Sequence, residues 1–278
     1  MAGVWVVVPV FDEVATLGRV VQAVRAHCPV IVVDDASTDE SARVAIRSGA
    51  AEVLRHPRRA GKGAALRTGF RAALRHGAAA VATLDGDGQH DPADLPRLLA
   101  AHRAAPDALV LGDRFGGKRG DPIPALRRAA IRAADRALGP LLPAPVSDSQ
   151  CGFRIYPGRF LRDVPLREER FVLETEALVR AVRAGYRLVS VPVRSVYPKG
   201  RQSRFQAVAD AARIGWYLAR AWADGRLAPA ARPTAIAPGR PPSDDRFAPV
   251  APLRDVAIAA GEPGASPPSP SRPARLTS

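Results

Sequence analysis

The 278-residue sequence is predicted to fold as an α/β protein with a mostly parallel, Rossmann-like sheet flanked by helices. Two patterns predict it. Short runs of apolar, β-branched residues recur along the first 195 residues, as in strands buried on both faces of a parallel sheet. Between these runs lie longer segments in which apolar residues repeat with helical spacing. The hydrophobic fraction of 47% is sufficient for a substantial core.

The individual elements follow in order along the chain. Continuous apolar runs predict strands at residues 4–10, 30–34, 81–84 and 108–111, with a later strand at 187–193. Helical periodicity predicts helices at residues 14–27, 41–48, 63–76, 92–103, 125–138, 174–184 and 205–224. Ser37, Thr38 and Asp91 precede predicted helices and are suitable N-caps.

The composition changes sharply after residue 225. Twelve of the residues from 226 to 278 are proline, mixed with Ala, Ser and Arg and with almost no aromatic residue. Such a segment buries too little apolar surface to offset the entropy lost on ordering. The sequence therefore predicts one folded domain over residues 1–225 and a disordered tail over residues 226–278.

The formal net charge of +14 favours an anionic partner, such as nucleic acid, a membrane surface or a nucleotide diphosphate. Nearly all of the positive charge is arginine, and a bias of this kind also arises from codon usage. No zinc finger or basic aromatic ribonucleoprotein motif is present, so nucleic acid is a poor fit. The charge thus leaves a membrane surface or a nucleotide as the favoured partner.

Several features bear on the compartment. The longest apolar run, residues 4–11, is far shorter than the roughly 20 residues that span a bilayer. The N-terminus has no basic start of the secretory type. Cys28 and Cys151 form neither a disulfide framework nor a metal-ligand pattern. We expect a reducing, cytoplasmic setting.

Acidic residues follow three of the predicted strands. They are Asp12 and Glu13, Asp34 and Asp35, and Asp85 and Asp87. Ligands of doubly wound sheets bind beyond the carboxyl ends of the strands. Helix capping explains one acidic residue per loop, but not Asp85 and Asp87 together with Gln89 nearby. Because close carboxylates repel unless a cation lies between them, and hard oxygen ligands suit Mg²⁺ or Mn²⁺, these three residues predict a divalent-cation site.

Two further motifs are weaker taken alone. Lys62 stands between Gly61 and Gly63 at a predicted helix start, where a phosphate could bind, although a simple glycine turn explains the same residues. Asp148 and Arg154 flank a predicted tight turn, where a surface ion pair is the alternative reading.

Eight motifs in order resemble family 2 glycosyltransferases with the GT-A fold, and within them the dolichol- or polyprenyl-phosphate mannosyltransferases. They are VVVPVFDE, VVDDAST, GKGAALRTGF, TLDGDGQHDP, LGDRFGG, DSQCGFRIY, RFVLETEALVRAVRAGY and KGRQSRF, spread over about residues 4–220. The resemblance implies a nucleotide-diphosphate sugar donor (GDP-mannose or a UDP-sugar), Mg²⁺ or Mn²⁺, inversion at the anomeric carbon, and a polyprenyl or dolichyl phosphate acceptor. The domain at residues 1–225 is then the GT-A catalytic domain.

The resemblance, together with the residue patterns at Lys62, Arg128 and Asp148, predicts roles for individual residues. Nucleotide-sugar contacts would come from Pro9, Phe11, Glu13, Asp35, Lys62, Asp85 and Arg114; the cation ligands would be Asp85, Asp87 and Gln89; the catalytic residues Asp87, Asp148 and Arg154; and the acceptor or phosphate contacts Arg128, Arg201 and Arg204. The late loop reads Gly-Arg-Gln-Ser-Arg where mannosyltransferases usually have Gly-Glu-Ser-Lys, and Ile131 stands where a small or amide residue is common. Both departures concern the acceptor side.

The acceptor decides whether a general base is needed. A lipid monophosphate is largely anionic near pH 7 and needs none. A sugar hydroxyl, as in polysaccharide or glycolipid synthesis, needs a base, and Asp148 is the candidate. Two other classes fit less well: a sugar nucleotidyltransferase would carry a Gly-rich basic loop after the first strand, and a catalytically silent nucleotide-binding scaffold would have lost Asp85 and Asp87. The oligomeric state stays open.

Two amphipathic helices suggest a lipid surface. Residues 125–138 place Arg128, Arg132 and Arg136 on one face. In residues 205–224 a broad apolar arc containing Trp216 and Trp222 opposes a narrow polar arc, formed by Gln206, Asp210, Arg213, Tyr217, Arg220 and Asp224. The apolar arc either packs against the catalytic domain or lies in a membrane interface. The second alternative predicts peripheral attachment at the inner face of the cell membrane.

Overall fold

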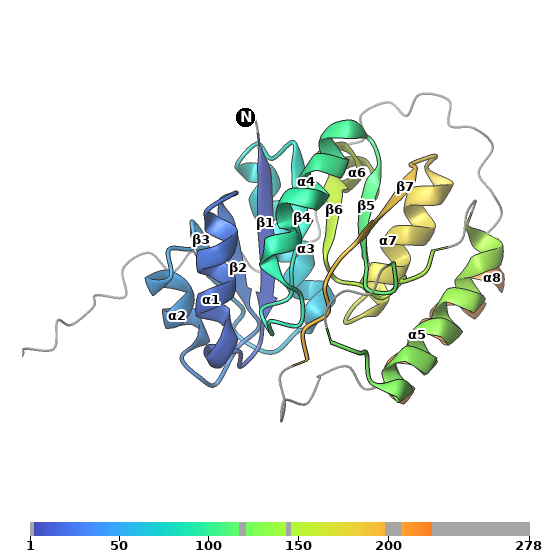
Figure 1. Cartoon of the computed structure of the whole chain (residues 1–278), viewed down its shortest axis with the longest axis horizontal. Helices are drawn as coiled ribbons and strands as arrows, with labels where there is room; N and C mark the ends of the chain where they lie inside the picture. Colours follow the sequence, from blue (N-terminus) through green and yellow to red (C-terminus); the bar gives the residue numbers. More distant parts are fainter. Residues whose placement is uncertain (1–2, 117–120, 143–145, 198–206, 224–278) are drawn as a thin grey trace, which may run out of the picture.

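The computed structural model describes residues 3–116, 121–142, 146–197 and 207–223 (Figure 1). Its centre is a seven-stranded sheet of order β3-β2-β1-β4-β6-β5-β7. Only β6, which lies between β4 and β5, runs antiparallel to its neighbours in this sheet. The strands are β1 (Val4–Val10), β2 (Val30–Asp34), β3 (Glu52–Arg55), β4 (Ala80–Thr83), β5 (Leu109–Asp113), β6 (Arg154–Pro157) and β7 (Leu188–Pro192). The predicted mostly parallel α/β fold is confirmed.

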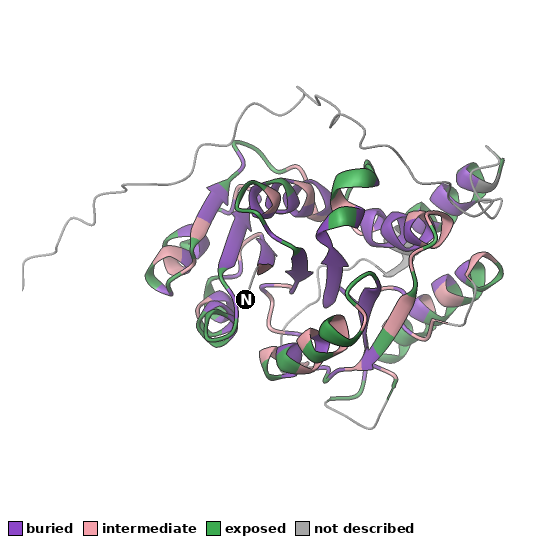
Figure 2. Ribbon diagram, turned by 90° about the horizontal axis from the view of Figure 1, so that it is seen from above, coloured by how far each residue is buried: buried purple, intermediate pink, exposed green. Residues whose placement is uncertain are grey.

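Helices cover both faces of the sheet. Helices α1 (Val14–Arg25), α2 (Ser41–Arg47) and α4 (Leu95–Ala104) lie on one face, and α3 (Lys62–Arg75), α6 (Gly158–Asp163) and α7 (Val172–Arg183) on the other (Figures 1 and 2). Alternate residues of β1 enter the two cores: Val6 and Val8 pack beneath α1, whereas Val7 packs beneath α3. This burial on both faces explains why β1 is apolar without interruption.

Three elements of the structure were not predicted from the sequence. Strand β3 has four residues, too few for a periodic signal, and β6 begins with Arg154 and ends with Pro157. Helix α6 has only six residues. The helix predicted at 92–103 is divided, with a 3₁₀ turn at Pro92–Asp94 before α4.

A further layer consists of α5 (Ala125–Leu138) and α8 (Ala207–Ala223), which pack together against α7. Four residues of α8 are buried in this contact: Ile214, Tyr217, Leu218 and Ala221. The assignment of Tyr217 to the polar arc was wrong, because α8 contacts two helices and its buried arc is correspondingly wide. Trp216 stays outside and is 71% exposed. Gln206 and Asp224 lie outside the described residues, as do the side chains of Asp210 and Trp222.

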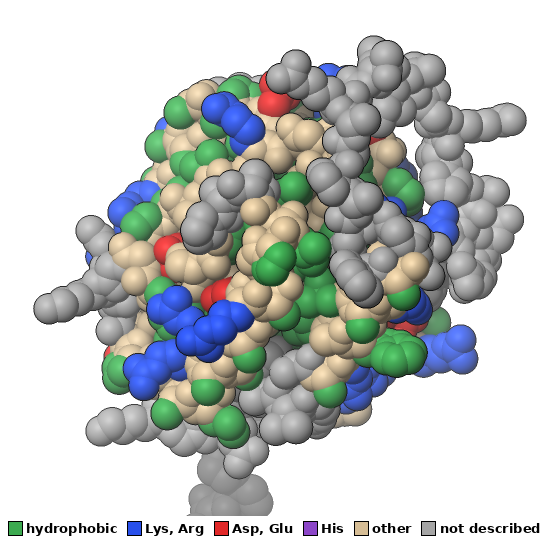
Figure 3. Space-filling model, turned by 90° about the vertical axis from the view of Figure 1, so that its right-hand side faces the viewer, with side chains coloured by type: hydrophobic (Ala, Val, Ile, Leu, Met, Phe, Trp, Pro, Cys, Tyr) green, Lys and Arg blue, Asp and Glu red, His purple; other side chains and the backbone are tan. Residues whose placement is uncertain are grey.

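The face formed by α5 and α8 is basic and partly apolar. Basic side chains, which are arginines on these helices, lie there among exposed apolar side chains (Figure 3). Leu126 of α5 is 67% exposed. None of the helices in the described ranges is long and apolar enough to cross a bilayer. The predicted domain boundary at residue 225 and the predicted tail lie beyond the described residues.

Candidate active site

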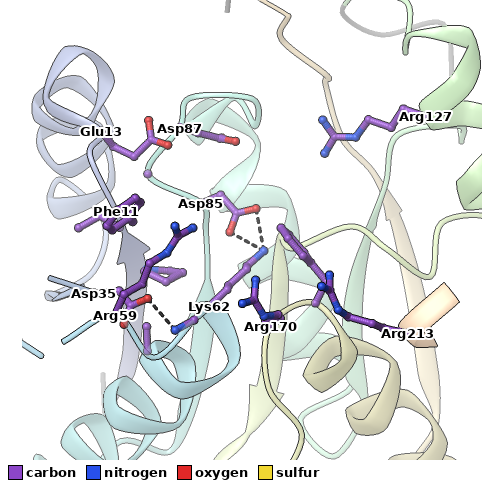
Figure 4. A pocket seen from close by; sticks show the side chains of 16 residues that line it. Phe11, Glu13, Asp35, Arg59, Lys62, Asp85, Asp87, Arg127, Arg170 and Arg213 are labelled. Atoms are coloured by element: carbon purple, nitrogen blue, oxygen red, sulfur yellow. Dashed lines mark hydrogen bonds and ion pairs between the residues drawn. The ribbon is translucent and has the colours of Figure 1, made fainter. Parts of the chain in front are cut away.

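A cavity of about 150 Å³ opens at the carboxyl ends of β1, β2 and β4. One wall comes from the loops after these strands, and the opposite wall from α5, α8 and the residues before α7 (Figure 4). Seven residues predicted from the sequence line it: Pro9, Phe11, Glu13, Asp35, Lys62, Asp85 and Asp87. The carboxyl ends of the parallel strands thus bring them together as expected.

The pKa values of Asp85 and Asp87, which lie on the strand wall, are shifted in opposite directions. Burial, and then the charge of Asp85, raise the pKa of Asp87 to about 6. Burial also opposes ionisation of Asp85, but the charge of Lys62 outweighs it and holds the pKa of Asp85 below its usual value. Two neighbouring half-buried carboxylates, of which one raises the pKa of the other, are stabilised by a cation between them.

The Asp85–Asp87 pair suits a divalent cation that takes part of its coordination shell from the substrate. Within the described ranges, no group of three or more His, Cys, Asp or Glu side chains could hold a metal ion by itself. Mg²⁺ in substrate-dependent sites commonly takes one or two carboxylates and completes its shell with phosphate oxygens and water. The pair therefore suits a cation that arrives with a diphosphate.

Gln89, predicted as a third cation ligand, is not among the residues that line the cavity. It is buried, and its side-chain oxygen accepts a hydrogen bond from Arg127 Nη1. Its backbone N–H donates to Asp87 Oδ1 at 2.9 Å. Through these two hydrogen bonds, Gln89 holds Asp87 and Arg127 in position.

Asp35 lines the cavity and also anchors the loop beside it. Its Oδ1 accepts from Ala60 N at 2.8 Å and lies 2.8 Å from His56 Nδ1, while its Oδ2 accepts from Gly61 N at 2.7 Å. These contacts hold the loop that carries Arg59, whose guanidinium lies 4.0 Å from the centre of the Phe11 ring. Asp35 therefore shapes the pocket around Phe11.

The opposite wall is basic and was not predicted. Arg127 of α5, Arg213 of α8, and Arg170 and Phe171 before α7 all line the cavity, as does Arg59 (Figure 4). The sequence singled out Arg128, which the structure leaves exposed and outside the cavity lining. Consecutive residues of a helix point about 100° apart, so the choice between Arg127 and Arg128 depends on how α5 packs.

Three predicted catalytic or phosphate-binding residues lie elsewhere: Arg114, Asp148 and Arg154 are buried and do not line the cavity. Arg114 donates to Asp148 from Nε at 2.7 Å and from Nη2 at 2.8 Å. The guanidinium of Arg154 donates to the backbone oxygens of Ser149, Cys151 and Glu174. These hydrogen bonds of the three side chains lie within the protein, and the roles predicted for them stay predictions.

The glycines around Lys62 allow a close approach to the segment before α7. A Cβ on Gly63 would lie 2.8 Å from the backbone carbon of Glu169, so glycine there lets the segment before α7 touch the start of α3. Gly61 has φ +91° and lies against Arg170. The predicted phosphate-binding contacts Arg201 and Arg204 lie outside the described residues.

Comparison with known proteins gives a consistent result. Residues 5–164 match the family Glycosyl transferase family 2. An undecaprenyl-phosphate mannosyltransferase of Micrococcus luteus is 32% identical, over 78% of this chain and 94% of its own length. A polyprenol monophosphomannose synthase of Mycolicibacterium smegmatis is 30% identical, over 68% of this chain and 75% of its own.

A solved structure extends the comparison to the fold. Glucosyl-3-phosphoglycerate synthase of Mycobacterium tuberculosis, in complex with Mn²⁺, uridine diphosphate and phosphoglyceric acid, superposes with a TM-score of 0.63 at 21% identity and covers 84% of this chain and 80% of its own. Its fold is the GT-A arrangement that the motifs predicted. Because the matched region contains the strand-end carboxylates and Lys62, and relatives of 30% identity or more extend over most of the chain, this protein is a glycosyltransferase and belongs to family 2.

Proposed function

We propose that the protein transfers a sugar from a nucleotide diphosphate, GDP-mannose or a UDP-sugar, to the phosphate of a polyprenyl or dolichyl lipid, with Mg²⁺ or Mn²⁺. The observation that carries the proposal is the two-sided cavity, which has carboxylates on the strand wall and Arg127, Arg170 and Arg213 on the helical wall. A donor diphosphate with its cation complements the first wall. A second phosphate, that of the acceptor, complements the second wall. The names of the two relatives, an undecaprenyl-phosphate mannosyltransferase and a polyprenol monophosphomannose synthase, support mannose as the sugar and a polyprenyl phosphate as the acceptor.

The proposed transfer reaction follows from this placement of the donor on the strand wall and of the acceptor phosphate on the helical wall. Asp85 and Asp87 would hold the cation, which when bound neutralises the charge that develops on the departing nucleoside diphosphate. An oxygen of the acceptor phosphate attacks the anomeric carbon of the donor sugar from the face opposite the departing diphosphate, forming one C–O bond. The C–O bond to the donor diphosphate breaks, and the diphosphate leaves with the electron pair. The acceptor is already anionic, so no residue must remove a proton.

The helical face beside the cavity suits a lipid acceptor. Arg128, Arg132 and Arg136 of α5 are exposed, and Leu126 and Trp216 present large apolar side chains on α5 and α8. Anionic leaflets attract each Lys or Arg near the surface by about 1 kcal/mol. We propose that this face contacts the inner face of the cell membrane and that the protein is otherwise cytoplasmic.

Membrane contact is expected to depend on the arginines of α5. The variant Arg128→Glu/Arg136→Glu should lose co-sedimentation with vesicles of phosphatidylglycerol at low salt, because two positive charges at the contact become negative. Wild-type protein should pellet at low salt and be released at about 1 M salt, where charges are screened beyond roughly 3 Å.

The matched control for this experiment is Arg19→Glu/Arg47→Glu, which makes the same charge change on exposed residues of α1 and α2 at the far end of the sheet (Figure 1). It should still pellet. Wild-type protein that stays in the supernatant at low salt, or equal loss in both variants, would contradict the proposed contact face.

The transfer reaction itself is tested with a donor panel and two acceptors. We expect labelled sugar to pass from GDP-mannose or a UDP-sugar to a short polyprenyl phosphate but not to the corresponding polyprenol, since only the phosphate brings an anionic nucleophile. Chelation of the cation should stop the reaction. Transfer only to a soluble sugar hydroxyl would show that the lipid assignment is wrong while leaving a glycosyltransferase.

A further inference from the structure

We infer that Glu174 is a positioning residue that retains Lys62 when a cation and donor bind, so that the Lys62 ammonium passes from Asp85 to the donor diphosphate. The inference rests on the proposed donor site. It assigns a function to a carboxylate that does not itself line the cavity.

The three side chains form a compact group: Lys62 and Asp85 line the cavity (Figure 4), and Glu174 is buried next to Lys62. Lys62 Nζ lies 2.7 Å from Asp85 Oδ1 and 2.9 Å from Asp85 Oδ2. On its other side it donates to Glu174 Oε1 at 3.0 Å. Burial opposes the charge of Lys62, but Asp85 and Glu174 outweigh it and raise its pKa, so the ammonium stays protonated. One cation is thus shared by two carboxylates, of which only Asp85 reaches the cavity.

The ion pair between Lys62 and Asp85 opposes the binding of a divalent cation to Asp85. Both oxygens of Asp85 face the Lys62 ammonium, and a divalent cation on the same carboxylate would be repelled by it. The Lys62 side chain is only 14% exposed, so its release from Asp85 without another partner would leave a largely buried charge unpaired, which is costly. Glu174 offers the alternative partner that makes the exchange possible.

The second oxygen of Glu174 supports the exchange. The residue is 1% exposed, and its Oε2 has no hydrogen-bond partner among the residues that the structure describes. A buried carboxylate oxygen without a partner is unfavourable. Lys62 carries three N–H donors, so it can occupy Oε2 when it leaves Asp85 and still direct a donor toward a phosphate.

The surroundings fix Glu174 in place. Arg154, which is fully buried, donates from Nη1 to the backbone oxygen of Glu174 at 2.7 Å. Gly152 lies against the whole group: a Cβ there would be 2.8 Å from Asp85 Oδ2, 2.9 Å from Lys62 Nζ and 3.0 Å from Glu174 Oε1. Arg154 therefore acts on the site through Glu174, although its own guanidinium does not line the cavity.

The same helix supplies a matched control. Glu176, two residues further along α7, is also fully buried, but it accepts from the backbone N–H groups of Arg167 and Glu168 and from Arg180 Nε. It does not line the cavity and contacts neither Lys62 nor Asp85 in these bonds. Glu176→Gln therefore removes a buried structural carboxylate without removing a hydrogen-bond partner of Lys62.

The test compares Glu174→Gln, Glu176→Gln and wild type by Mn²⁺ binding, measured by electron paramagnetic resonance with and without GDP or UDP. We expect Glu174→Gln to weaken Mn²⁺ binding by at least about tenfold, because Lys62 then stays on Asp85 and its charge is no longer offset. In kinetics the Mn²⁺ concentration for half-maximal rate should rise, with kcat largely recovered at saturating Mn²⁺. Glu174→Asp should recover part of the affinity.

A purely structural glutamate predicts a different pattern. Glu176→Gln should lower Tm but leave Mn²⁺ binding unchanged. Wild-type Mn²⁺ affinity in folded Glu174→Gln, or equal weakening in both variants, would overturn the inference. Absence of Mn²⁺ and nucleotide binding in the wild type would instead refute the proposed donor site, so the two failures are distinguishable.

Discussion

Substitution of Asp87 by alanine is expected to abolish sugar transfer while the fold stays intact. Asp87 lines the cavity, and burial together with Asp85 raises its pKa to about 6. The alanine therefore removes a proposed cation ligand and also relieves repulsion. Loss of an outer-sphere residue at a metal site commonly costs 10–100-fold, so loss of a direct ligand should lower kcat/KM by more than about 100-fold. Transfer of labelled sugar and Tm, measured on the same preparation, check both parts.

The isosteric variant and an acidic control sharpen this experiment. Asp87→Asn keeps the shape and should be nearly as inactive, because an amide replaces the carboxylate. Asp91→Ala removes a nearby carboxylate that caps the following turn through Ala93 N, and it should keep activity. Undiminished turnover by Asp87→Ala in the presence of a chelator would disprove the cation site.

The largest stability effect is expected at Asp148. Its side chain makes a bidentate ion pair with Arg114, and the residue is 1% exposed. Asp148→Asn leaves the Arg114 guanidinium charged and buried without its counter-ion. Removing one partner of a buried pair costs about 3–5 kcal/mol. For a domain of this size Tm should fall by roughly 6–20 °C, measured by circular dichroism.

A double variant separates the structural role from the base that a hydroxyl acceptor would need. Replacing both partners, Arg114→Leu/Asp148→Leu, should recover much of the lost stability, since no buried charge remains. Below its melting range, Asp148→Asn should retain kcat with lipid phosphate. An unchanged Tm with loss of transfer to a sugar hydroxyl would instead make Asp148 a general base.

Local sequence predicted the regular elements where the pattern was long. Strands β1 and β2 and helix α5 were predicted with their observed bounds, because their apolar residues repeat over five to fourteen positions. Short elements failed for the opposite reason. Strand β6 has four residues, and Arg154 reads as surface from sequence although its guanidinium satisfies three buried backbone oxygens.

The sequence by itself determined the acidic wall of the site and the enzyme family. Parallel strands end at one edge of their sheet, so Glu13, Asp35 and Asp85 had to meet wherever the loops led. Only the tertiary structure decided the basic wall and the Lys62 exchange group. Lys62 and Glu174 are 112 positions apart. Arg127 reaches the cavity because it lies on the same face of α5 as the buried residues Ile131, Ala134 and Leu138. Contacts of that separation depend on how helices dock, which local periodicity does not encode.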